Sequence, residues 1–146
     1  MDAFQKLRKL ADGASDEQEG SPPITLCPNG HHGEMAVNDP ELGDKTKGFA
    51  VFHAQMGGGK TMPLLKTMLS SACENDCNYC VFRQPRNYQR LSFAPHEMAD
   101  VFIKMLRRGL VRGLFLSSGV VGGGIKSQDR LIQTVEILRH KYNYRG

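Results

Sequence analysis

Residues 71–80 read Ser-Ala-Cys-Glu-Asn-Asp-Cys-Asn-Tyr-Cys. Cys73, Cys77 and Cys80 therefore stand in a CxxxCxxC spacing on one short stretch, and Tyr79 directly precedes the last cysteine. A [4Fe-4S] cluster normally takes four cysteine ligands, so a loop that supplies three leaves one iron open to a ligand that is not protein. The spacing predicts such a cluster, and an open iron is a place where chemistry can occur.

Zinc, disulfides and a purely structural role are the alternatives for these cysteines. A structural zinc site needs four protein ligands in a closed tetrahedron, and the other candidates, Cys27, His31 and His32, lie far upstream. Disulfides need an oxidising compartment, whereas the chain opens without the apolar core of a signal peptide. We therefore expect reduced thiols and favour the cluster. A zinc-binding interaction module that uses Cys27 or a histidine as its fourth ligand stays an alternative.

Length and composition are those of one globular domain with a real core, because the chain has 146 residues, of which 40% are hydrophobic and 23% charged. No apolar stretch approaches the roughly 20 residues of a membrane span, and no targeting segment is visible. We therefore expect a cytoplasmic protein without a membrane partner. The net charge of +4 is compatible with binding a polyanion but does not demand it.

The first half of the chain alternates between patterned and irregular segments. Residues 2–12 place apolar side chains on one face, as in a short amphipathic helix that docks on something. Residues 13–47 are rich in Gly, Pro, Asp, Glu, Ser and His, which predicts an irregular or flexible segment. Residues 48–53 and 62–69 are apolar runs suited to strands, and the second run leads directly into the cysteines.

The second half is more regular. Residues 95–108 have helical apolar spacing, with proline in the first turn and arginines in the last. A short strand at 114–116 runs into a loop of serine and glycine residues, and a second helix is expected over 128–141. The order strand, helix, strand, helix implies parallel strands, at whose carboxyl ends functional groups gather. The cysteine stretch and residues 117–119 both fall at that end.

A competing motif lies upstream of the cysteines. Residues 54–61, Ala-Gln-Met-Gly-Gly-Gly-Lys-Thr, resemble a relaxed Walker A loop. The strict pattern begins with glycine, and here Pro63 stands where the phosphate-binding helix would gather its hydrogen bonds. A glycine-rich hairpin turn between Phe52 and Leu64 is the favoured interpretation. A P-loop nucleotide binder stays an alternative.

Three stretches in the second half carry a family resemblance. They read Pro-Leu-Leu-Lys-Thr-Met-Leu-Ser-Ser-Ala-Cys-Glu-Asn-Asp-Cys-Asn-Tyr-Cys at 63–80, Phe-Ala-Pro-His-Glu-Met at 93–98 and Gly-Leu-Phe-Leu-Ser-Ser-Gly-Val-Val at 113–121. With them the chain resembles the radical SAM superfamily. Within it, the chain is similar to the radical SAM proteins described as DNA modification or repair proteins, commonly found beside a uracil-DNA glycosylase-like partner.

The resemblance implies an α/β fold in two parts. Residues 62–146 would form the amino-terminal part of a radical SAM (β/α) barrel, its first two strand-helix units, and residues 1–61 a helix with an irregular amino-terminal extension. Because the family barrel has about six such units, we expect the chain to be a truncated fragment. Enzyme activity is then expected where the full barrel is present, and the chain alone would be inactive.

The resemblance also implies a cofactor pair. Cys73, Cys77 and Cys80 would ligate three irons of a [4Fe-4S] cluster, and S-adenosyl-L-methionine would chelate the fourth. A flavodoxin- or ferredoxin-type electron donor would reduce the cluster. Cleavage of the carbon–sulfur bond would then give methionine and a 5′-deoxyadenosyl radical, which abstracts hydrogen from the substrate.

Further residues take roles from the resemblance alone. Tyr79 would lie along the adenine. Ser117, Ser118 and Gly119 would touch the methionine amino group, in a place where many relatives have Gly-Gly-Glu. Ala94 stands where relatives often have Thr or Ser, so the helix that follows lacks a side-chain cap, a loss of about 1 kcal/mol.

Basic residues follow the cysteines and interleave with Tyr88. Those that interleave with Tyr88 are Arg83, Arg86 and Arg90, and further along the chain come Lys104, Arg107, Arg108 and Arg112. Such a composition suits contact with the phosphates of a nucleic-acid substrate, and equally suits charged surfaces in contact with water.

Overall fold

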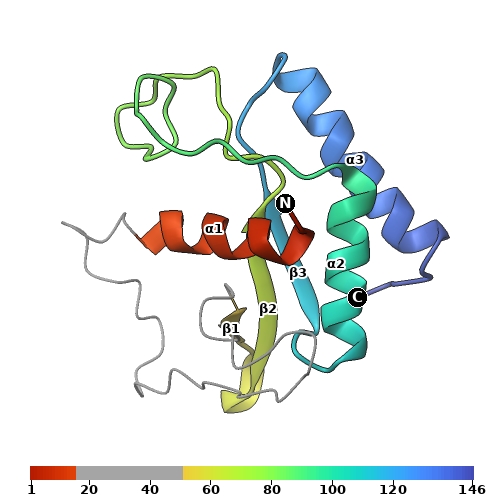
Figure 1. Ribbon diagram of the computed structural model, residues 1–146. Helices are drawn as coiled ribbons and strands as arrows, with labels where there is room; N and C mark the ends of the chain where they lie inside the picture. The colour runs from red at the N-terminus through yellow and green to blue at the C-terminus, as the bar shows by residue number, and fades with distance from the viewer. Residues whose placement is uncertain (16–50) are drawn as a thin grey trace.

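Helices and strands alternate along the part of the chain that the computed structural model describes, residues 1–15 and 51–146. The helices are α1 (Ala3–Ser15), α2 (Pro95–Arg107) and α3 (Gly124–His140), and the strands are β1 (Val51–Gln55), β2 (Thr61–Met68) and β3 (Gly113–Ser117) (Figure 1). A 3-10 turn, η2 (Gly57–Gly59), joins β1 to β2. The predicted irregular segment, with Cys27, His31 and His32, lies almost wholly outside the described residues.

The strands form one mixed sheet in the order β1-β2-β3. β1 and β2 pair antiparallel, with Phe52 opposite Leu64, and β2 and β3 pair parallel, with Met68 opposite Ser117. The predicted hairpin and the predicted parallel pair are both confirmed. These three strands and three helices establish an α/β fold, while the partial barrel stays a prediction.

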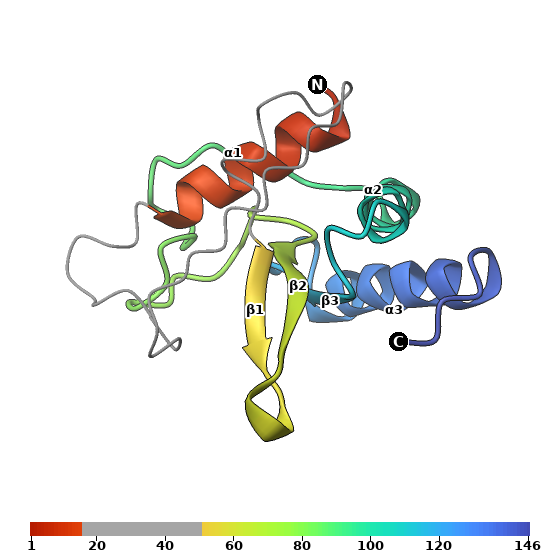
Figure 2. The ribbon, with the colours of Figure 1, turned by 90° about the horizontal axis from the view of Figure 1, so that it is seen from below.

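Helix α2 contributes more buried apolar side chains than any other described helix or strand. Its predicted apolar stripe is buried, as expected from a helix that covers a core, except for Leu106, which is partly buried. The buried members are Met98, Ala99, Val101, Phe102, Ile103 and Met105. α2 contacts both α1 and α3 (Figures 1 and 2), and the core continues into β2 through Leu65.

The predicted amino-terminal helix docks on this same core. Leu7 and Leu10 of α1 are buried in the cluster that contains Leu65 and Phe102. Since β1 also pairs with β2, the described residues before position 62 pack together with those after it. Within the described residues no helix has the length and apolar character needed to cross a membrane.

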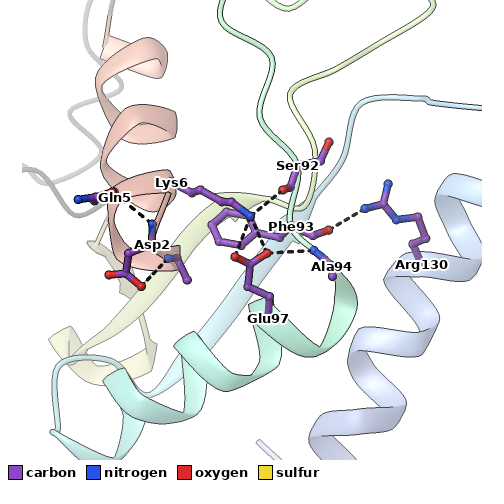
Figure 3. Close-up of polar contacts among 9 residues, drawn as sticks. Asp2, Gln5, Lys6, Ser92, Phe93, Ala94, Glu97 and Arg130 are labelled. Carbon is purple, nitrogen blue, oxygen red and sulfur yellow. Dashed lines mark hydrogen bonds and ion pairs between the residues drawn. The ribbon is translucent and has the colours of Figure 1, made fainter.

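Helix α2 begins without a side-chain cap, as predicted for Ala94. The Glu97 carboxylate accepts the Ala94 N–H at 3.3 Å, which is half of a capping box. Lys6 of α1 lies 2.7 Å from both oxygens of the same carboxylate (Figure 3). Glu97 therefore fixes the start of α2 and joins it to α1.

Helix α3 begins four residues earlier than predicted, at Gly124 rather than at residue 128. The Ser127 hydroxyl accepts the Val121 N–H at 2.8 Å and so holds the loop before the helix. After the helix, the Tyr142 hydroxyl donates to Asp100 of α2. This hydrogen bond, with Lys141 nearby, lowers the pKa of Asp100.

Candidate metal centre

The three cysteines lie on the long connection between β2 and α2, residues 69–94, here called the cysteine loop. Cys73, Cys77 and Cys80 are free thiols, and each is partly exposed. The loop begins where β2 ends, at the same end of the sheet as the connection from β3 to α3, residues 118–123, here called the glycine loop (Figure 1). The predicted placement of both loops at the carboxyl ends of two parallel strands is confirmed.

Serine side chains fix the neck of the cysteine loop, where its outgoing and returning legs meet. Ser70 and Ser92 form a β-bridge, and their hydroxyl oxygens are 2.6 Å apart. Ser71 is fully buried; its hydroxyl accepts the Leu91 N–H at 2.9 Å and donates to the Leu91 carbonyl at 3.3 Å. The two ends of the loop are therefore held together by polar contacts inside the protein.

The returning leg is also attached to all three helices. The Lys6 ammonium of α1 donates to the Ser92 carbonyl at 3.3 Å and lies 5.3 Å from the centre of the Phe93 ring. From α3, Arg130 donates to the Phe93 carbonyl at 2.6 Å (Figure 3). Because α2 begins two residues after Phe93, this leg is attached to α2 through the chain itself.

Arg90 joins the two legs from inside the loop. One guanidinium nitrogen donates to the carbonyls of Ser71 at 2.9 Å and Phe82 at 2.5 Å. The other donates to those of Arg83 at 2.7 Å and Arg86 at 3.1 Å. The sequence suggested phosphate contact for Arg90, whereas the structure gives its guanidinium four backbone acceptors.

The glycine loop packs directly on the start of the cysteine loop. The Gly119 N–H donates to the Ser70 carbonyl at 2.7 Å, and the Leu69 N–H donates to the Ser117 carbonyl at 2.7 Å. A Cβ atom at Gly119 would lie 2.1 Å from the Ala72 carbonyl oxygen. Only glycine fits this approach, and two backbone groups of the predicted methionine-binding stretch are already engaged by the cysteine loop.

Glu74 makes a second connection between the two loops. Its N–H donates to the Val120 carbonyl at 2.8 Å. Its carboxylate accepts the N–H groups of Gly122 and Gly123, just before α3 begins. A carboxylate is stabilised there by the positive end of the helix dipole. No sequence pattern indicates this contact, apart from the position of Glu74 directly after the first cysteine.

The side chains predicted to touch the cofactor differ in their exposure and hydrogen bonding. Tyr79 is 93% exposed, at the outer part of the cysteine loop. The Ser118 hydroxyl donates to the neighbouring Gly119 carbonyl at 2.8 Å, and Ser117 is exposed at the end of β3. Their cofactor roles stay predictions.

The donor chemistry of the cysteine loop fits an iron-sulfur cluster, because three free thiols lie on one loop with fixed ends. Among residues 1–15 and 51–146, no three His, Cys, Asp or Glu side chains are close enough together to hold a metal ion. The three thiols therefore do not converge in this structure. To bind one cluster, the largely exposed outer part of the loop after Glu74, residues 75–79, must rearrange over the fixed neck.

The other candidate sites are not completed by the described residues. The Walker-like stretch forms the turn between β1 and β2, and a strand follows it rather than the helix that a phosphate site needs. Arg107 and Arg112 lie near the turn between α2 and β3, at the opposite end of the sheet from the cysteine loop (Figure 1). These two basic residues therefore do not border the cysteines.

The described residues thus define an α/β protein in which two loops meet at the carboxyl ends of parallel strands, and one of them carries three free thiols. Comparisons with protein-family models, with curated proteins and with solved structures find no match to this chain.

Proposed function

We propose that the chain binds a [4Fe-4S] cluster through Cys73, Cys77 and Cys80, and S-adenosyl-L-methionine at the open iron, as the amino-terminal part of a radical SAM enzyme. The observation that carries the proposal is the set of three free thiols on one loop whose neck is fixed beside a parallel strand end. Three thiolates in this spacing match the ligand count that leaves one iron open.

When bound, the two cofactors would supply one-electron cleavage of a carbon–sulfur bond and so a radical able to abstract hydrogen. The residues of this chain would hold and shield them. The buried hydroxyl of Ser71 and the guanidinium of Arg90 keep the legs of the cysteine loop together. Gly119 and Glu74 keep the glycine loop against it, so both loops would border the same site.

The proposal includes three further elements that follow from the chemistry and the resemblance. A one-electron donor of the flavodoxin or ferredoxin type would reduce the cluster. Reduced thiols suit the cytoplasm, because its redox buffers oppose disulfides. A nucleic acid is the proposed substrate class, with a uracil-DNA glycosylase-like protein as the proposed partner.

Anaerobic reconstitution with ferrous iron and sulfide tests the metal centre. We expect a brown protein with about four irons and as many sulfides per chain, and loss of both when Cys73, Cys77 or Cys80 is replaced by alanine. Cys27→Ala is the matched control and is expected to retain the cluster. A colourless protein that binds one zinc without sulfide, and loses it in Cys27→Ala, would instead support the zinc-binding module.

A further inference from the structure

Arg90 differs from the other basic residues of the cysteine loop in what its side chain does. Its four acceptors lie on both sides of the cysteines: Ser71 precedes Cys73, and the other three follow Cys80. A guanidinium has five donors in a rigid planar fork and no acceptor. It is therefore well suited to join several carbonyl groups that approach from different directions.

The surroundings of Arg90 support this role. The Arg90 side chain is half-buried, and its guanidinium carbon lies 6.0 Å from the centre of the Tyr88 ring. The Tyr88 ring in turn packs edge-on against the buried Phe82, with ring centres 5.1 Å apart. An arginine available to bind a phosphate would present its N–H donors to solvent. The Arg90 donors instead bind backbone carbonyls of their own loop.

We propose that Arg90 is the positioning residue of the metal centre. By joining the leg before Cys73 to the leg after Cys80, it sets the span across which the first and last thiols meet a cluster. The inference rests on the proposed function, because it assigns Arg90 to the same site. Loss of a group that orients metal ligands typically lowers metal affinity by about 10- to 100-fold.

The experiment uses the full chain, reconstituted anaerobically, and follows iron release to a chelator in excess. Arg86→Ala is the matched control, because Arg86 is an exposed arginine on the same loop. We expect Arg90→Ala to release iron about 10- to 100-fold faster than the wild type, Arg90→Lys to fall between them, and Arg86→Ala to equal the wild type. The electron paramagnetic resonance signal of the reduced cluster should broaden in the Arg90 variants alone.

The outcomes separate a failure of the Arg90 inference from a failure of the proposed function. If Arg90→Ala and Arg90→Lys release iron at the wild-type rate with an unchanged spectrum, the inference is wrong while the proposed function stands. If the wild type binds no cluster, the proposed function fails, and alkylation of the metal-free thiols still tests Arg90. If Arg90 holds the two legs of the loop together, Cys80 should be alkylated faster in Arg90→Lys than in Arg86→Ala. Equal alkylation rates would overturn the inference. Should Arg90→Ala not fold, Arg90→Lys carries both measurements.

Discussion

The two ends of β2 each carry a motif typical of ligand binding, and the structure surrounds them differently. Before β2, the glycine hairpin, residues 56–60, makes a tight turn in which a Cβ atom added at Gly57 would meet nothing within 4 Å. After β2, the cysteine loop packs closely against the glycine loop. A Cβ atom added at Gly119 of the glycine loop would lie 2.1 Å from the Ala72 carbonyl oxygen of the cysteine loop. A motif becomes a candidate site where other segments of the fold close around it.

The largest expected effect on stability comes from adding a methyl group at Gly119, compared with adding one at Gly57 of the glycine hairpin. We expect Gly119→Ala to lower the free energy of unfolding by about 1–3 kcal/mol, because its Cβ atom overlaps the Ala72 carbonyl. Gly57→Ala is the matched control and should change it by less than about 0.5 kcal/mol. Urea unfolding of both variants measures the difference. Equal values would mean that the two ends of β2 are packed alike.

A smaller effect is expected from the neck of the cysteine loop. Ser71→Ala removes a buried hydroxyl and leaves the Leu91 N–H without that acceptor. The expected loss in the free energy of unfolding is about 1–2 kcal/mol. Thr61→Ala, at the exposed start of β2, should stay within about 0.5 kcal/mol of the wild type. Thermal unfolding compares the two, and an undiminished stability of Ser71→Ala would contradict a fixed neck.

Glu97 tests the attachment of the returning leg to α1 and α2. Glu97→Gln removes the ion pair with Lys6 and weakens the only side-chain contact to the Ala94 N–H found among the described residues. We expect a loss of about 1 kcal/mol, because the pair is partly exposed and the cap is incomplete. Glu136→Gln, on the exposed side of α3, serves as control. The comparison fails if both variants unfold at the same urea concentration.

The smallest effect is expected at Lys60 of the glycine hairpin. Because no helix begins after this turn, we expect neither the wild type nor Lys60→Ala to bind ATP tightly. The substitution should also leave the free energy of unfolding unchanged. Isothermal titration of ATP into the wild type and the variant checks this. Tight binding by the wild type that the substitution abolishes would restore the P-loop interpretation.

Most helices and strands could be predicted because their signals are local. The apolar stripe of Met98, Val101, Phe102, Met105 and Leu106 predicted a helix, and the short apolar run around Leu114 predicted a strand. The early start of α3 escaped prediction because glycines give no helix signal of their own. The loop before it is held by the Ser127 hydroxyl and by a carboxylate from another loop, and a local pattern does not include such contacts.

The candidate metal centre likewise has a part that the sequence predicted and a part that it did not. Cysteine spacing identified the three thiols, but the groups that hold their loop, Arg90 and Glu74, bind backbone atoms distant in sequence. Backbone carbonyls are present at every residue, so no residue type marks the four that Arg90 binds. The convergence of the thiols also lies beyond the pattern, since it depends on the path of the exposed outer part of the loop.

The most direct test of a cluster with an open iron is electron paramagnetic resonance of the reconstituted, reduced protein, before and after addition of S-adenosyl-L-methionine. We predict a [4Fe-4S]⁺ signal that changes when the cofactor is added, because the cofactor binds the iron that no cysteine holds. Cys77→Ala should give no such signal. A wild-type signal that the cofactor leaves unchanged, or no signal at all, would contradict the account.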